Sequence, residues 1–389
     1  MDEMQVQGGR EAAEKKGGRG RRFLVFFLIL LAVLSVVVVV AYRDGTGLDV
    51  LRRYFNYGGS ASAAETEYLY ESDASSRFAL LDDRLVTVSD SALQILKSDG
   101  KEIYSKALQM RAPALSVGGG YAAAVDVGGS QLLVVDREGE RLSLTADEAE
   151  PFISANLNGN GWLAVTERTK NYKASVSVYN DKMQKVFTFN SSRRFVMDAW
   201  VTEDGRSLAA VTLGQADSVF VSDIVLYDLD SKDPRTTYSI TDGLVLSIGQ
   251  VGGRLTTVAD TGISFADTAG KLRGTYSYAE EYLREYDLGA DNCAVLLLNR
   301  YRSGSVGRLV TVGTDGTQQA ELDIRDEVLD LSAAGRYIAV LYTDRLVIYT
   351  TQLQEYATFS GIDSVKGVRM RSDGSAVLLG ARKATVFVP

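Results

Sequence analysis

A strand-forming motif recurs along most of this 389-residue chain, and its spacing limits the possible folds more than any other feature. From Glu65 onward, short runs rich in Val, Leu, Ile and Tyr alternate with Gly, Asp and Asn, without the long 3.6-residue periodicity of helices. The equivalent strands start near Arg84, Tyr121, Gly161, Arg206, Arg254, Asn292, Arg336 and Ser375, which are 37 to 48 residues apart. The clearest repeat, from Glu327 to Ser360, contains four short strands. Repeats of this length with four strands each predict an all-β chain folded as a β-propeller.

The last repeat supplies only three strands before the chain stops at Pro389. An open ring would leave unpaired strand edges, which are prone to aggregation. The segment from Glu67 to Glu71 belongs to no complete repeat, so we predict that it closes the ring as the outer strand of the last blade. This prediction gives eight blades. Seven blades are the alternative, because the first strand of the first repeat, Phe78 to Leu81, is short.

A second feature is an uncharged run of twenty residues from Phe23 to Tyr42. At about 1.5 Å of rise per residue, such a helix matches the roughly 30 Å hydrocarbon core of a bilayer. Basic residues are more frequent before the run than after it, so the positive-inside rule places the N-terminus in the cytoplasm. A signal peptide cleaved near Ala41 is the alternative, but its apolar core would be unusually long.

We therefore predict four segments. They are a disordered cytoplasmic tail (1–22), a single transmembrane helix (23–42), a juxtamembrane linker (43–64) and an extracellular propeller (65–389) at the cell membrane. In a four-stranded blade the outer strand begins on the same face as the short turns. The linker should therefore reach the propeller on that face, and the longer loops should point away from the membrane.

Composition excludes several classes of function. The 42 basic and 50 acidic residues give a net charge of −8, and the charge is −10 without the six basic and four acidic residues of the tail. Nucleic acid is therefore not an expected partner. The chain has no histidine and a single cysteine, Cys293, so Ser-His-Asp, Cys-His and His-ligated zinc sites are excluded. We predict no catalytic residues, no metal and no cofactor.

Longer connections between strands are where binding residues tend to lie. Three such connections are expected at Glu167 to Ala174, Leu213 to Ser222 and Asn299 to Gly307. The candidate binding residues, which are basic or aromatic, are Lys170, Tyr172, Lys173, Arg193, Arg194, Arg300, Tyr301 and Arg302. Arg and Tyr often anchor interfaces, although Lys and Arg also simply keep loops soluble.

Two functions are consistent with these features. The first is a non-catalytic binding or scaffold module, held in the membrane by Phe23 to Tyr42, whose partner is an envelope protein, a peptide or an anionic wall polymer. The second is a hydrolase that uses carboxylates gathered in the propeller channel from several blades, which sequence spacing alone does not reveal.

Four motifs carry a family resemblance: Phe55-Asn56-Tyr57, the turn and strand from Asp204 to Ala209, the run from Gly335 to Leu341, and the close from Asp373 to Val377. On these motifs the chain resembles a family of single-span membrane proteins from Firmicutes with an extracellular β-propeller of unknown function. The resemblance implies a surface location and implies no activity.

Overall fold

The structure, a computed structural model, describes residues 19–43, 49–50, 52–54, 64–70, 72–216, 219–231, 233–241, 243–362 and 364–389. The chain divides into two compact units, Met1–Gly59 and Ser60–Pro389. Most of the expected tail, the larger part of the expected linker, and Phe55-Asn56-Tyr57 lie outside the described residues.

The first unit contains helix α1, Arg19–Arg43, which begins four residues before the expected membrane segment and includes all of it. Side chains are described for residues 23–37 of α1, and the large apolar ones among them are exposed. Within the described residues, no helix combines the length and the hydropathy that a membrane crossing requires. Residues 49–50 and 52–54 are also helical.

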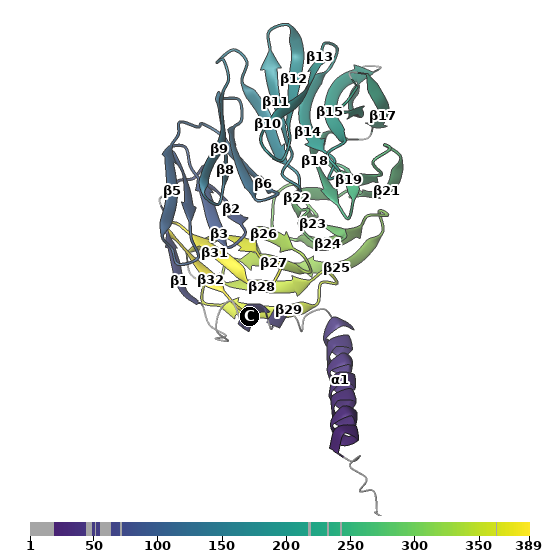
Figure 1. Cartoon of the computed structure of the whole chain (residues 1–389). Helices are drawn as coiled ribbons and strands as arrows, with labels where there is room; N and C mark the ends of the chain where they lie inside the picture. The colour runs from purple at the N-terminus through teal and green to yellow at the C-terminus, as the bar shows by residue number, and fades with distance from the viewer. Residues whose placement is uncertain are drawn as a thin grey trace, which may run out of the picture. The chain divides into compact units, whose positions relative to one another are not determined.

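The second unit is a propeller of eight four-stranded antiparallel sheets among its described residues (Figure 1). Eight blades were predicted, and this prediction is confirmed. The innermost strands are β2 (Arg77–Leu81), β6 (Pro113–Gly118), β10 (Phe152–Leu157), β14 (Phe195–Val201), β18 (Val245–Val251), β22 (Tyr282–Asp287), β26 (Val328–Ala334) and β30 (Val365–Met370). The second strands are β3 (Arg84–Val88), β7 (Tyr121–Asp126), β11 (Leu163–Thr169), β15 (Ser207–Ala216), β19 (Arg254–Ala259), β23 (Cys293–Asn299), β27 (Tyr337–Tyr342) and β31 (Ala376–Gly380).

The third strands are β4 (Ala92–Leu96), β8 (Gln131–Asp136), β12 (Tyr172–Tyr179), β16 (Val219–Asp228), β20 (Gly262–Ala266), β24 (Gly307–Gly313), β28 (Arg345–Thr350) and β32 (Lys383–Phe387). The outer strands are β5 (Glu102–Ala107), β9 (Gly139–Thr145), β13 (Lys185–Ser191), β17 (Pro234–Ile240), β21 (Leu272–Ser277), β25 (Gln318–Ile324), β29 (Glu355–Ser360) and β1 (Ala64–Leu69).

The burial of each strand follows its position in the blade. Middle strands are covered on both sides by neighbouring blades, so they are mostly apolar and buried, and every residue of β23 is buried. Outer strands have one covered side, and the burial of β21 alternates residue by residue from Arg273 to Ser277. Apolar clusters join adjacent blades, as where Ile348 of β28 and Val368 of β30 belong to one core cluster. The core therefore consists of layers between blades.

Strand β1 closes the ring. It pairs antiparallel with β32, with Tyr68 opposite Ala384 and Leu69 opposite Lys383. In Figure 1 the purple N-terminal strand β1 lies beside the yellow strand β32. The expected pairing is confirmed, although the strand begins at Ala64, three residues earlier than predicted, and Glu71 lies outside the described residues.

The alternating strand directions define two faces. The turn face carries the turns that join first to second and third to fourth strands, such as residues 158–161 and 373–374. The loop face carries the other connections. Because Ala64 pairs with Val386, at the turn-face end of β32, β1 enters the propeller on the turn face.

Candidate functional site

Two of the three expected long connections are hairpins of paired strands. In the third blade, β11 and β12 remain paired up to Thr169 and Tyr172, which leaves only Lys170 and Asn171 at the tip. In the fourth blade, β15 and β16 remain paired up to Ala216 and Val219. The expected loops at Glu167 to Ala174 and Leu213 to Ser222 are therefore wrong. The hairpin ends project from the ring, so they carry exposed polar and aromatic side chains that resemble a loop in sequence.

The third expected connection is a loop. Residues 300–306 join β23 to β24 after the last strand pair, Asn299 with Gly307. The backbone N–H of Arg300 donates to the carbonyl of Val306 at 3.0 Å. The Tyr301 side chain is 62% exposed, and the Arg302 guanidinium lies 5.4 Å from the centre of the Tyr282 ring. This loop displays two cations and a tyrosine on the loop face.

The structure separates the predicted binding residues into two groups. In the third and fourth blades, Lys170, Tyr172, Lys173 and Arg193 are exposed, and the Lys173 Nζ lies 5.0 Å from the centre of the Phe195 ring. Arg300, Tyr301 and Arg302 form the second group, in the sixth blade. Both groups lie on the loop face. Among the described residues, no contact joins the two groups directly.

Arg194 has a structural role. Its Nη1 lies 2.5 Å from Oδ2 of the buried Asp223 of β16. A Cβ on Gly214 of β15 would come within 2.8 Å of the same nitrogen, so the guanidinium fills the space that this glycine leaves. Arg194 thus ties the start of β14 to the projecting hairpin of its own blade, and its Nη1 is already engaged within the protein.

Exposed apolar side chains on the loop face are the main feature that sequence reasoning missed. They concentrate on the fourth to seventh blades. We call the following set the apolar sector: Phe195, Met197, Phe220, Leu244, Leu246 and Leu329, which are 38% to 68% exposed. Large apolar side chains that are exposed as a group often mark an interaction site, whereas a single exposed apolar side chain is common on any protein surface.

β-bulges explain why this sector was missed. The register of three innermost strands shifts by one residue, at Met197, Leu246 and Leu329. In each case the residues on either side pair with two consecutive residues of the second strand, and the bulged residue between them is unpaired. A one-residue bulge inverts the inside-outside alternation of a strand. The preceding Val196, Val245 and Val328 are buried, whereas the bulged residue is exposed. Comparison of the repeats would have shown an apolar residue directly before a polar one in each of these strands.

The polar residue after the bulge faces the channel and ties blades together. Asp198 Oδ2 accepts from the backbone N–H of Ile248 in the next blade at 3.2 Å. Asp330 Oδ2 likewise accepts from the N–H of Val368 at 2.7 Å. Arg369 continues this belt, because its Nη1 donates to Asp330 and its Nε donates to the carbonyl of Phe78 in the first blade.

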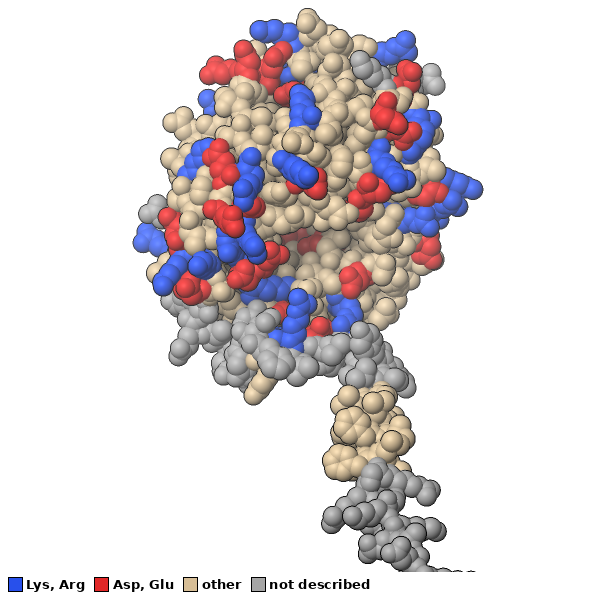
Figure 2. Space-filling model, viewed as in Figure 1, with Lys and Arg blue, Asp and Glu red and all other residues tan. Residues whose placement is uncertain are grey.

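Glu285 is a channel carboxyl group whose acidity is strongly altered. It hydrogen-bonds with Asp330 and with the N–H of Leu331. Burial, and then the neighbouring Asp330, raise the pKa of Glu285 to about 8. Burial also raises the pKa of Asp198 and of Asp287. Glu285, Asp287 and Asp330 line a cavity of about 480 Å³, and Figure 2 shows acidic side chains inside the hollow at the centre of the face in view.

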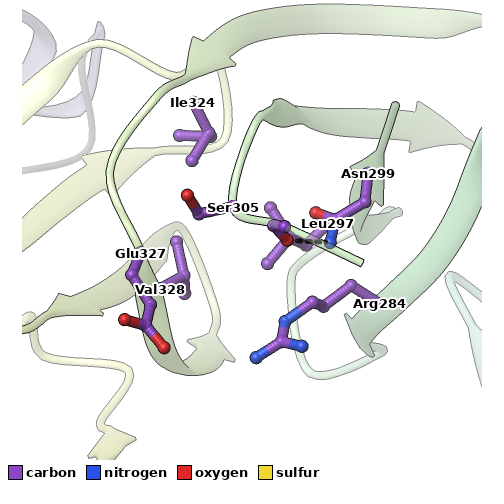
Figure 3. A pocket seen from close by; sticks show the side chains of 8 residues that line it. Arg284, Leu297, Asn299, Ser305, Ile324, Glu327 and Val328 are labelled. Atoms are coloured by element: carbon purple, nitrogen blue, oxygen red, sulfur yellow. Dashed lines mark hydrogen bonds between the residues drawn. The ribbon is translucent and has the colours of Figure 1, made fainter. Parts of the chain in front are cut away.

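A second cavity, of about 280 Å³, opens between the sixth and seventh blades at the loop face. Its buried wall is formed by Leu297, Ile324 and Val328, beside the amide of Asn299. Figure 3 shows Arg284 and Glu327 on opposite sides of this pocket. Arg284 is the bulged residue of β22, so the bulge directs its side chain to the pocket.

The residues described by the structure include no group of three or more His, Cys, Asp or Glu side chains arranged to hold a metal ion.

Several solved structures share the propeller architecture. They are BamB from Moraxella catarrhalis, with 14% identity over 82% of this chain and 98% of that chain and a TM-score of 0.52; the C-terminal WD40 domain of Sif2, with 13% identity over 83% and 99% and a TM-score of 0.56; and the computationally designed protein Ika8, with 10% identity over 83% and 96% and a TM-score of 0.57. At such low identity the likeness shows the fold alone. No curated protein sequence matches the chain.

One family model bears on the expected resemblance to propeller proteins of unknown function. The model of DUF5711, a family of unknown function, matches residues 54–378, from shortly before the closing strand into the last blade. This match covers nearly all of the propeller, so the chain belongs to the DUF5711 family.

Proposed function

We propose that this protein is a non-catalytic binding module of the cell envelope that α1 anchors in the cell membrane, with the propeller outside the cell. The loop face binds a partner protein. The proposal follows the topology of the Firmicutes family that the sequence resembles.

One observation carries the binding proposal: exposed apolar side chains lie together with cations and aromatic rings on the loop face. Phe220 is 68% exposed and Tyr301 is 62% exposed. Protein interfaces combine a desolvated apolar centre with Arg and Tyr anchors. The loop face carries both kinds of residue, in the apolar sector and in the loop of residues 300–306. A soluble propeller would gain solubility from polar side chains at these positions, so a binding role accounts for them better.

The sequence and the closing strand support the anchor. The run from Phe23 to Tyr42 contains no charged residue over a length that matches a bilayer. The chain enters the propeller on the turn face through β1, which is the face opposite the proposed binding residues.

Cysteine labelling on intact cells tests the proposed topology. The natural Cys293 is fully buried, and burial raises the pKa of its thiol to about 11, so it should not react with a membrane-impermeant maleimide. We expect the Arg137→Cys variant, with its cysteine in an exposed turn, to be labelled on intact cells. We expect Ala12→Cys to be labelled only after permeabilisation. Labelling of both variants, or of neither, on intact cells would contradict the topology, and loss of Ala12→Cys from the mature protein would indicate a cleaved signal peptide.

Site-specific photo-crosslinking in cells tests the binding face. With a photoreactive phenylalanine analogue in place of Phe220 or Tyr301, we expect a crosslinked protein of the same mass from both positions. The matched control places the analogue at Arg137, an exposed position on the turn face. Phe220→Ala combined with Phe195→Ala should weaken binding of the captured protein at least tenfold, in the range expected for apolar anchors. A product of equal yield from Arg137, or none from either loop-face position, would refute a loop-face interface.

A carboxylate-dependent hydrolase is the second candidate function, favoured by the hydrogen-bonded pair Glu285 and Asp330 at the wall of the channel cavity. The hydrogen bonds of this pair, however, already serve the blade contacts. Asp330 accepts from Val368, Leu331 and Arg369, and Glu285 accepts from Leu331. Direct contact also leaves no room for a sugar between the two groups, whereas glycosidase carboxyls lie at least about 5 Å apart. The binding module is therefore better supported.

A further inference from the structure

The pocket between the sixth and seventh blades carries two opposite charges without partners. Among the described residues, neither the Arg284 side chain nor the Glu327 side chain makes a hydrogen bond or an ion pair. Figure 3 shows their side chains on opposite sides of the pocket, with Ser305 and Leu297 between them. Arg284 presents up to five N–H donors, which suit a carboxylate, and Glu327 presents oxygen acceptors, which suit an ammonium group.

The wall between these charges is apolar and preformed. Leu297 and Ile324 are each 2% exposed and Val328 is 5% exposed, so their positions are set by the core of the propeller. The Asn299 amide donates to the carbonyl of Gly304 at 2.9 Å and thereby holds the loop that borders the pocket. A volume of about 280 Å³ lies just below the usual range for ligand pockets, about 300–1,000 Å³, which limits the pocket to a small ligand.

We propose that this pocket binds a small aliphatic zwitterion of dipeptide size. Its carboxylate pairs with Arg284, its ammonium group pairs with Glu327, and its aliphatic side chains lie against Leu297, Ile324 and Val328. A dipeptide separates its two charges by a peptide unit, which fits charged residues on opposite sides of one cavity better than a single amino acid does.

Calorimetry with four matched probes and the full-length purified protein tests this proposal. The probes are dileucine, its amide without the carboxylate, its N-acetyl derivative without the ammonium group, and diglycine without the aliphatic side chains. We expect dileucine to bind with a dissociation constant of about 1 mM or below, and each of the other three to bind at least tenfold more weakly.

Two variants assign each charge to its partner. Arg284→Gln should bind dileucine and its amide equally, because the residue that recognises the carboxylate is gone. Glu327→Gln should bind dileucine and its N-acetyl derivative equally. Both positions are exposed, so neither variant should change the melting temperature. The control Arg206→Gln removes an exposed arginine on the turn face. It should still bind dileucine more tightly than the amide and more tightly than the N-acetyl derivative.

The proposal is overturned if dileucine does not bind at roughly 10 mM, well above the affinity expected for a ligand of this size, or if either preference persists in its matching variant. It is also overturned if diglycine binds as well as dileucine. None of these results would change the crosslinks expected from Phe220 and Tyr301, so this pocket can fail while the proposed protein interface stands.

Discussion

The Tyr68→Ala variant is expected to lower the free energy of unfolding by about 3–5 kcal/mol, the usual cost of truncating a large buried aromatic side chain. Tyr68 is fully buried in β1, and Arg371 Nη2 donates to its hydroxyl at 3.3 Å. The substitution leaves a cavity in the strand pair β1–β32, where the N-terminal strand of the propeller completes the last blade. Equilibrium denaturation in urea measures the change.

The neighbouring residue supplies a matched control. Leu69 lies in the same strand and is 67% exposed. Leu69→Ala removes a side chain of similar apolar character from the outer surface, so its effect should remain within about 0.5 kcal/mol. Equal losses for both variants would mean that β1 contributes through its backbone pairing alone, and negligible losses for both would mean that β1 does not close the ring.

The Glu285→Gln variant is expected to be more stable than the natural protein by about 2 kcal/mol at pH 9 and similar to it at pH 5. Glu285 has a pKa raised from 4.5 to about 8 in the folded state, so the folded protein holds a proton that the unfolded chain releases. The free energy of unfolding therefore falls as pH rises from about 4.5 to 8. Glutamine removes this dependence and can still donate to Asp330. The expected gain in the free energy of unfolding is smaller than the full pKa shift would give, because the side chain is partly solvated.

Denaturation curves of both proteins at pH 5, 7 and 9 measure this effect. The control is Glu148→Gln, which removes an exposed carboxylate on the loop side of the second blade. Its difference from the natural protein should be independent of pH over this range. If the stability difference for Glu285→Gln is also constant, the proton of the channel pair is not held by Glu285.

Much of the fold could be predicted from local patterns. Strand length, the apolar middle strands and the recurring turns all depend on neighbours in sequence, and these predicted the second strands to within two residues, as at Gly161 for β11. The pairing of β1 with β32 also followed from the count of strands, because a last blade of three strands would leave an unpaired strand edge.

The binding residues were harder to predict, because their exposure depends on register. Phe195 and Met197 belong to a strand with the composition of a buried one, and the exposure of Met197 depends on the bulge that follows the buried Val196. Lys170 and Tyr172 have the composition of a loop, yet they belong to a projecting hairpin. The channel carboxylates are tied to backbone groups 38 to 50 residues away, a distance at which no local pattern indicates the partner.

The shared role of β1, which follows the N-terminal helix and also completes the last blade, has a consequence for synthesis. Tyr70 donates to the carbonyl of Gly380, which is 310 residues further along the chain. At about 5–20 residues per second, a ribosome needs roughly 15–60 s to cover that distance. During this interval the first strand waits without its partner, and a chain that terminates early never acquires it. Closure of the ring therefore cannot precede the synthesis of β32, and until then the inner strands of the last blade lack their outer partner.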